Sequence, residues 1–183
     1  MSDFQNKGYT VVRNAISSDM AALFAQYTLF ANSQGRTITD TQVDGSKAAY
    51  ADPLMESLLL YLQPVIEQNT GLQLFPTYSL YRIYSPGQVL APHKDRPSCE
   101  ISMTLCLGYD YKGSDYEYPI FVDGERFVLY PGDLVCYRGV DLTHWREEFK
   151  APASSWHSQV FLHYVDANGP YADFKYDKRN HIG

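Results

Sequence analysis

The chain has 183 residues, enough for one domain with a substantial core, and its composition is that of an ordinary globular protein, with 45% hydrophobic and 20% charged residues. A formal net charge of −6 argues against a broad nucleic-acid-binding surface. Neither a membrane span nor a leader peptide is visible, and three cysteines without a C-x-x-C pair do not indicate a disulfide framework, so the sequence predicts a protein of the reducing cytoplasm.

The first part of the chain, about residues 1–70, predicts helices. After a short β-branched run at 8–12, a helix is expected from about 19 to 31, capped by Ser17 or Ser18. The polar stretch 32–45 predicts a loop, which either shapes the mouth of a pocket or is an ordinary connection. Pro53 opens a second predicted helix, from about 54 to 69, with Gly71 just past its end.

From Leu72 onward the pattern changes to short strands separated by turns. In the extended run 73–84, Arg82 and Tyr84 lie on the same face because side chains alternate along a strand. Asp123-Gly124-Glu125, between two strand-like runs, is typical of a hairpin. Further strands are expected at 101–107, 119–122, 126–130, 133–138 and 159–165.

This order of elements predicts an α+β fold: a double-stranded β-helix, or jelly roll, braced by the N-terminal helices. We expect a single domain over 1–183. Its helical part covers about 1–70, its β-core about 72–166, and a polar C-terminal tail about 167–183.

One motif in the β-core carries chemistry. His93 and Asp95 stand two residues apart, so both point to one face of an extended segment, while Lys94 points away. His144 follows about fifty residues later, beyond several predicted strands. Two imidazoles and one carboxylate on one face of a metal form the facial triad of non-haem Fe(II) oxygenases, which leaves the other coordination positions open. The sequence therefore predicts His93, Asp95 and His144 as metal ligands and catalytic residues.

The residues around this motif resemble the Fe(II)- and 2-oxoglutarate-dependent dioxygenases, in particular their prolyl-hydroxylase-like branch. The matching positions are Tyr84 to Gly87, His93 with Asp95, the turn Pro131 to Asp133, and His144. The resemblance implies a jelly-roll fold, Fe(II) as the metal, 2-oxoglutarate as cosubstrate and O2 as oxidant. It also implies that Tyr84 contacts the cosubstrate and, because the carboxylate Asp95 is present, that the reaction is hydroxylation or a related oxidation rather than halogenation.

The chain departs from the family pattern at the cosubstrate anchor. The prolyl hydroxylase pattern has an Arg or Lys about nine to ten residues beyond the distal His, where this chain has Ala153 and Ser154. The distal carboxylate of 2-oxoglutarate still needs a cation and hydroxyl donors. The candidates for cosubstrate binding beside Tyr84 are Arg82, Arg96, Arg138, Arg146 and His157, and among the arginines Arg146 and Arg138 are favoured.

The missing basic residue keeps a second interpretation open, a cupin-like metalloenzyme that uses the jelly roll and the metal without 2-oxoglutarate. A third interpretation is a catalytically silent binding or sensor domain that keeps the barrel. For the dioxygenase, the polar loops at 32–45, 108–118 and 147–155 suit a small-molecule, amino-acid or peptide substrate. The sequence does not determine the oligomeric state.

Overall fold

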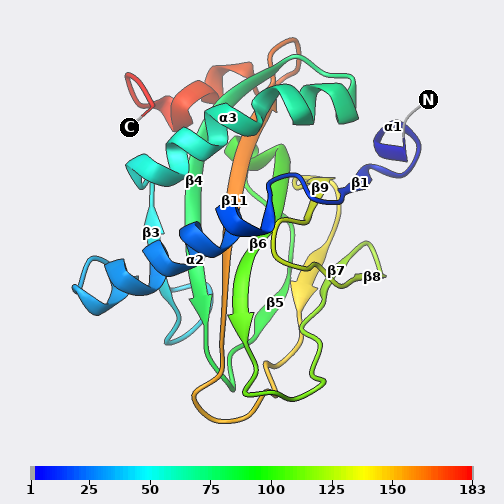
Figure 1. The fold of residues 1–183 in the computed structure, drawn as a ribbon. Helices are drawn as coiled ribbons and strands as arrows, with labels where there is room; N and C mark the ends of the chain where they lie inside the picture. The colour runs from blue at the N-terminus through cyan, green and yellow to red at the C-terminus, as the bar shows by residue number, and fades with distance from the viewer. Residues whose placement is uncertain (1–2, 183) are drawn as a thin grey trace.

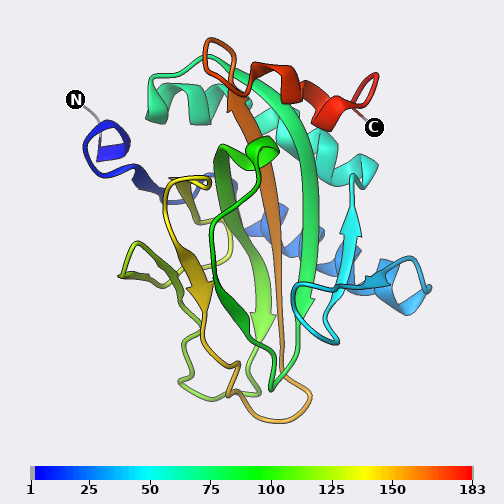
Figure 2. The same ribbon diagram turned by 180° about the vertical axis from the view of Figure 1, so that it is seen from behind.

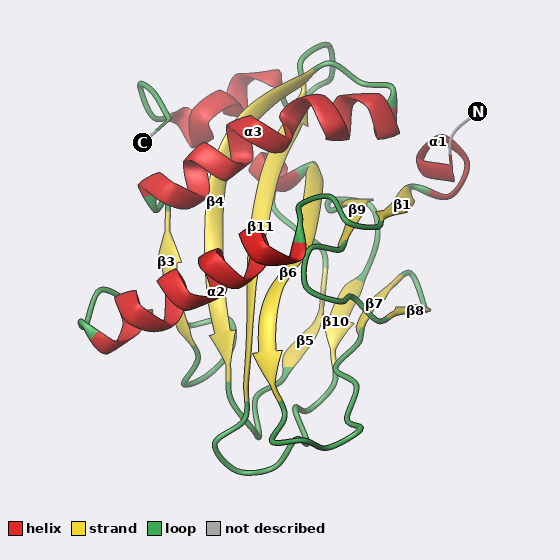
Figure 3. Ribbon diagram, viewed as in Figure 1, coloured by secondary structure: helices red, strands yellow, loops and turns green. Residues whose placement is uncertain are grey.

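The computed structural model describes residues 3–182 and shows two facing β-sheets with helices on one side (Figures 1 and 3). The larger sheet has seven strands in the order β1-β9-β6-β11-β4-β3-β2, all paired antiparallel. Its strands are β1 (Tyr9–Val12), β2 (Ile38–Thr39), β3 (Lys47–Tyr50), β4 (Leu74–Tyr84), β6 (Ile101–Asp110), β9 (Leu134–Arg138) and β11 (Trp156–Asp166).

The smaller sheet has four strands in the order β5-β10-β7-β8 and lies across the barrel from the larger one (Figure 2). These strands are β5 (Leu90–His93), β7 (Ile120–Val122), β8 (Glu125–Phe127) and β10 (His144–Arg146). The predicted hairpin joins β7 to β8. Asp123 and Gly124 form its two-residue turn with φ values of 51° and 85°, as the favoured tight hairpin turn requires.

Helices α2 (Ser18–Ser33) and α3 (Pro53–Thr70) cover the outer face of the larger sheet (Figure 1). Ser17 caps α2 by accepting from the Met20 amide, and Asp52 caps α3 by accepting from the Leu54 and Met55 amides. Gly71 ends α3 in the left-handed conformation, with φ of 74°. The main core lies between these helices and the sheet, which leaves the opposite face of the sheet free to line the barrel interior.

Short helices complete the fold: α1 (Asp3–Lys7) and the 3-10 segments η1 (Pro97–Cys99) and η2 (Ala172–Lys178). The C-terminal segment, predicted as a tail, packs on the larger sheet. There the Asp177 carboxylate pairs with Arg96 at 2.7 and 2.8 Å, and Tyr50 and Ser98 donate to it. Among residues 3–182 no helix is both long and apolar enough to cross a membrane. Two sheets with bracing helices confirm the predicted α+β jelly roll.

Candidate metal and cosubstrate site

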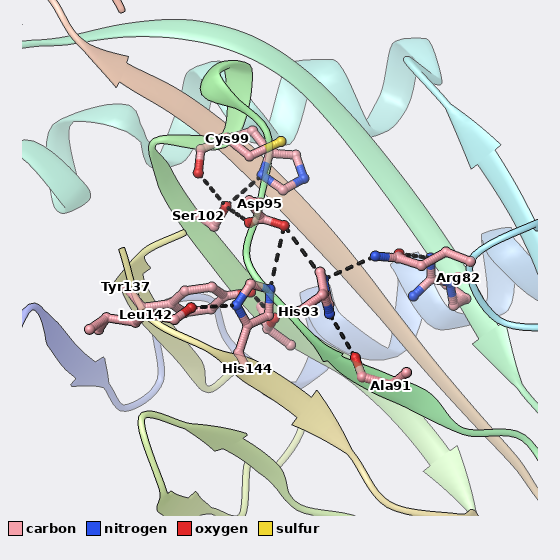
Figure 4. Close-up of polar contacts among 12 residues, drawn as sticks. Arg82, Ala91, His93, Asp95, Cys99, Ser102, Tyr137, Leu142 and His144 are labelled. Carbon is pink, nitrogen blue, oxygen red and sulfur yellow. Dashed lines mark hydrogen bonds and ion pairs between the residues drawn. The ribbon is translucent and has the colours of Figure 1, made fainter. Parts of the chain in front are cut away.

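The antiparallel pairing of β5 with β10 brings the two halves of the predicted metal motif together. His93 ends β5, His144 begins β10, and the two are direct partners in the ladder. The Asp95 carboxylate lies between them, with Oδ1 at 3.6 Å from His93 Nε2 and 3.4 Å from His144 Nε2 (Figure 4). All three potential ligand atoms lie within 4.8 Å of one another. The fold thus supplies the third ligand that spacing alone could not place.

Both imidazoles are oriented in the same way by the backbone. His93 Nδ1 donates to the Ala91 carbonyl at 2.8 Å, and His144 Nδ1 donates to the Leu142 carbonyl at 3.0 Å (Figure 4). In each case the acceptor is the carbonyl two residues earlier. In a neutral imidazole this bond places the ring proton on Nδ1 and directs the Nε2 lone pair at the shared centre, the arrangement typical of metal-binding histidines.

Asp95 is held as a carboxylate. Burial raises its pKa, but the contacts with His144 and His93 outweigh burial and lower that pKa below its ordinary value. Ser102 donates to Asp95 Oδ2 at 2.7 Å, and the Asp95 amide bonds the Gly139 carbonyl at 2.8 Å. A Cβ on Gly139 would lie 2.4 Å from Asp95 Oδ2, so only glycine fits there. Two neutral imidazoles and one ionised carboxylate are the donor set that Fe(II) requires.

Behind Asp95, away from the two imidazoles, lies a second group of potential ligands, Asp95, Cys99 and His163. Ser102 bridges Asp95 to His163, whose Nδ1 is 2.9 Å away, while Cys99 contacts the Tyr78 hydroxyl at 3.0 Å. Burial lowers the pKa of His163 to about 4 and raises that of the Cys99 thiol. Through the Ser102 hydroxyl this group supports the Asp95 carboxylate from the side opposite the two imidazoles.

We call the three predicted ligands, His93, Asp95 and His144, the metal set. A cavity of about 480 Å³ opens beside it. Its wall includes all three predicted ligands together with side chains from both sheets and from the segment between β2 and β3. Those outside the metal set are Asp40, Thr41, Gln42, Tyr78, Leu80, Arg82, Leu90, Lys94, Arg96, Cys99, Tyr137, Phe161 and His163. Its volume falls within the range for small-molecule sites.

Arg82 is the buried cation that faces this cavity, and only 1% of it is exposed. Its guanidinium donates to Tyr84 Oη at 3.0 Å, to Asp40 Oδ2 at 2.8 Å through Nε, and to Gln42 Oε1 at 2.7 Å. The Gln42 amide also reaches His93 Nε2 at 3.0 Å. A single amide group therefore spans the gap between Arg82 and the metal set.

Arg146 lies deeper in the barrel, two residues after His144. It donates to the Tyr118 carbonyl and to Gln159 Oε1, each at 2.6 Å, and is also 1% exposed. No carboxylate within the described part of the chain pairs with it, and its Nε and the Gln159 amide nitrogen are buried without a partner there. Gln159 is the ladder partner of Arg82, so we call Arg82, Gln159 and Arg146 the arginine layer.

The other residues predicted to bind the cosubstrate lie at several places around the arginine layer. Tyr84 lies beside this layer, with its ring centroid 5.5 Å from the Arg82 guanidinium and 5.8 Å from that of Arg146. His157 is the ladder partner of Tyr84 on β11. Burial lowers its pKa well below the ordinary value, and the Tyr111 hydroxyl lies 2.8 Å from its Nδ1. Arg96, at the cavity wall, is paired with Asp177.

Arg138 points away from the cavity. Its guanidinium lies 5.0 Å from the Phe4 ring centroid, on the outer side of the sheet. The physical reason is strand alternation, because its neighbour Tyr137 faces the barrel, with its ring 4.6 Å from that of His144. The sequence argument favoured Arg138 as an anchor without fixing which face of its strand turned inward, and we leave it out of the proposed site.

Sequence reasoning missed the part played by Asp40 and Gln42. Both lie in the polar stretch 32–45, which was predicted as a loop that either forms a pocket mouth or merely connects two elements. In the structure this stretch includes β2 and then lines the cavity. The only local signal was polarity, which does not distinguish the two alternatives.

No protein-family model matches the sequence, and no curated sequence matches it. Solved structures do match. A prolyl-4-hydroxylase from Pseudomonas putida aligns with a TM-score of 0.67 at 17% identity, covering 90% of this chain and 95% of that one. The α-ketoglutarate-dependent epimerase SnoN from nogalamycin biosynthesis gives a TM-score of 0.72 at 12% identity, covering 98% and 88%. EctD from S. alaskensis with bound Fe gives 0.66 at 17% identity, covering 90% and 74%.

The chain has the fold of these oxygenases. The resemblance predicted from its motifs is therefore confirmed at the level of the fold. At these identities the comparison does not extend to the reaction, because the matched proteins include a hydroxylase and an epimerase.

Proposed function

We propose that the protein is a non-haem Fe(II)- and 2-oxoglutarate-dependent dioxygenase acting on a small molecule or a peptide segment in the cytoplasm, most simply by hydroxylation. The observation that carries the proposal is the metal set itself: two Nε2 atoms and one ionised carboxylate oxygen converge on one point beside a cavity. His93, Asp95 and His144 would hold the metal. When bound, Fe(II) and 2-oxoglutarate together activate O2 to oxidise the substrate, and succinate and CO2 are released.

The charges of the site fit a dicarboxylate. A divalent ion held by Asp95 keeps one net positive charge, which suits the carboxylate of a 2-oxo acid. In the arginine layer, Arg82 and Arg146 carry two positive charges and Asp40 balances one of them. The layer therefore keeps one net positive charge before a ligand binds, and this positive potential would attract the distal carboxylate to Arg82. Two positive centres, one on either side of the Gln42 amide, are complementary to the two ends of 2-oxoglutarate.

Within this layer we propose that Arg82 and Tyr84 contact the distal carboxylate. Arg82 faces the cavity, and its guanidinium donates to the Tyr84 hydroxyl at 3.0 Å. Arg146 donates to two neutral oxygens, the Tyr118 carbonyl and Gln159 Oε1, and lies on the Tyr84 ring. It would add positive potential to the site without contacting the ligand carboxylate directly. The anchor would then come from the first strand of the β-core rather than the last, which accounts for the missing basic residue near Ala153.

The outer part of the cavity would receive the prime substrate. Tyr78, Leu80 and Phe161 give this part an apolar and aromatic wall, and Lys94 lies at the rim. Such a wall would exclude water from the side of the metal set where the substrate lies. The wall has no feature specific to one substrate, so hydroxylation of a small molecule or peptide is the class we propose.

The test is a titration of the apo-protein with Fe(II) under anaerobic conditions, followed by succinate release after 2-oxoglutarate and O2 are supplied. We expect one metal per chain and slow succinate formation even without a prime substrate. Both should be lost in His144→Ala and retained in His181→Ala, an exposed histidine of the C-terminal segment. Metal binding without any binding of 2-oxoglutarate would instead support the cupin-like alternative, and no metal binding would support the silent barrel.

A further inference from the structure

The segment between β2 and β3 places two side chains where a cosubstrate would lie. Asp40 Oδ2 accepts hydrogen bonds from two nitrogens of Arg82, Nε and one terminal nitrogen. Gln42 accepts from Arg82 at 2.7 Å and donates to His93 Nε2 at 3.0 Å. We call residues 40–42 the strap. Its side chains bridge a cation that we assign to the distal carboxylate and a nitrogen that we assign to the metal.

The strap is lightly attached to the rest of the fold. The ladder before it consists of two pairs, Ile38 with Ala48 and Thr39 with Lys47. After it, Val43 is fully buried and fixes the far end. Between these points Thr41 and Gln42 are exposed. Of the backbone groups of the strap, the Asp40 N–H donates to the Ser46 carbonyl at 3.0 Å and the Gln42 N–H donates to Asp40 Oδ1 at 2.7 Å. The strap can therefore move while both of its ends stay in place.

Arg82 cannot serve two carboxylates equally. Four of its five donors are directed to Asp40, Gln42 and Tyr84 in the present arrangement. A second carboxylate beside Asp40 would meet like-charge repulsion in a buried setting, where charges are poorly screened. The carboxylate of a ligand must therefore displace Asp40 from the guanidinium.

We propose that the strap is an internal competitor of the cosubstrate: Asp40 occupies the carboxylate site on Arg82 together with Gln42 Oε1, and 2-oxoglutarate binds by displacing both from the guanidinium, whereas the contact of Gln42 with His93 Nε2 would be replaced by the metal ion itself. This inference rests on the proposed function. Asp40 determines the apparent affinity, since the fraction of molecules with a closed strap is unavailable to the ligand. Because the strap also forms part of the cavity wall, its withdrawal would also change the shape of the cavity beside the metal set.

The first test measures the affinity of 2-oxoglutarate for protein loaded with Mn(II), a metal probe that does not support turnover, by calorimetry. Asp40→Asn removes the competing charge and should tighten binding about fivefold. The matched control is Asp44→Asn, which removes an equal charge from an exposed position on the same connection and should leave the affinity unchanged. Equal or weaker binding by Asp40→Asn overturns the proposal.

The second test follows displacement itself by hydrogen exchange of residues 38–46 in the same Mn(II)-loaded protein. Addition of 2-oxoglutarate should accelerate exchange at the Asp40 backbone amide, because withdrawal of the strap breaks its bond to the Ser46 carbonyl. Pyruvate, a 2-oxo acid without the distal carboxylate, should have a smaller effect. Unchanged or slower exchange with 2-oxoglutarate overturns displacement even if Asp40→Asn binds more tightly. Failure of every form to bind 2-oxoglutarate, Asp40→Asn included, overturns the proposed function instead.

Discussion

His144 and Arg146 are two residues apart on β10 and both point into the barrel, yet their surroundings are built in different ways. His144 belongs to a metal set whose orientation comes from short-range bonds, each imidazole to a carbonyl two residues earlier. Arg146 belongs to a layer assembled from three strands of both sheets. The metal set is complete in its protein groups, whereas the arginine layer keeps one positive charge that no described carboxylate balances. We propose that this positive charge attracts a ligand carboxylate to the layer.

The largest expected effect concerns the metal set. Asp95→Ala removes the one anion among the ligands, so we expect metal affinity to fall by more than about 100-fold and turnover to be abolished. The fold should remain, because β5, β10 and the main core do not depend on this side chain. Metal titration and thermal unfolding measure the two effects. An active Asp95→Ala enzyme with bound iron would contradict the role assigned to this carboxylate.

Within the arginine layer, Arg82→Met should have the larger effect. It removes charge-assisted bonds to the distal carboxylate, which predicts about 100-fold weaker binding of 2-oxoglutarate with metal affinity unchanged. It also leaves Asp40 without its cation, so we expect a lower unfolding midpoint. Arg138→Met is the matched control, because that guanidinium packs on Phe4 outside the barrel. If Arg138→Met weakened cosubstrate binding as much as Arg82→Met, Arg82 would lose its assignment.

Arg146→Met should sharpen the contrast between the two arginines. Removing Arg146 relieves the cost of a buried charge without a carboxylate partner but leaves the Tyr118 carbonyl and Gln159 Oε1 without a donor, so the free energy of unfolding should change little. The loss of positive potential behind Tyr84 should weaken 2-oxoglutarate binding only about tenfold. Calorimetry and denaturant unfolding of both variants check this order. A larger loss of affinity in Arg146→Met than in Arg82→Met would reverse our assignment of the anchor.

The smallest effect is expected from Tyr84→Phe. It deletes the hydroxyl that accepts from Arg82 at 3.0 Å and leaves the ring between the two arginines. We expect about threefold weaker binding of 2-oxoglutarate, the size of a single hydrogen bond. In a double-mutant cycle this effect should couple to Arg82→Met and be nearly additive with Arg146→Met. Coupling to Arg146 alone would place the carboxylate on the other side of Tyr84.

The sequence predicted two of the three metal ligands from a local signal, because the spacing of His93 and Asp95 fixes their common face in an extended segment. His144 was predicted through the resemblance to the dioxygenases, in which a Pro-Gly-Asp turn precedes the distal His. The helices were predicted from local signals as well: Ser17, Pro53 and Gly71 mark their ends through backbone chemistry.

The arginine layer could not be predicted in this way. Its members come from three strands, and whether Arg138 or Arg146 faces the barrel depends on register and on which face of each strand turns inward. The partner of Arg82 lies 42 residues earlier, in a stretch that showed only polarity. The packing of the C-terminal segment on the larger sheet was not predicted. It depends on contacts of Asp177 with Arg96, Tyr50 and Ser98, which lie far away in the sequence and which no local pattern encodes.

The most direct test of the account is anaerobic addition of Fe(II) to the apo-protein with and without 2-oxoglutarate, monitored by visible absorption. The account predicts a weak charge-transfer band only when both are present, lost in His144→Ala and shifted to much higher 2-oxoglutarate concentrations in Arg82→Met. Iron binding without such a band at any 2-oxoglutarate concentration would contradict the account, because the metal set would then lack the cosubstrate that the arginine layer is proposed to hold.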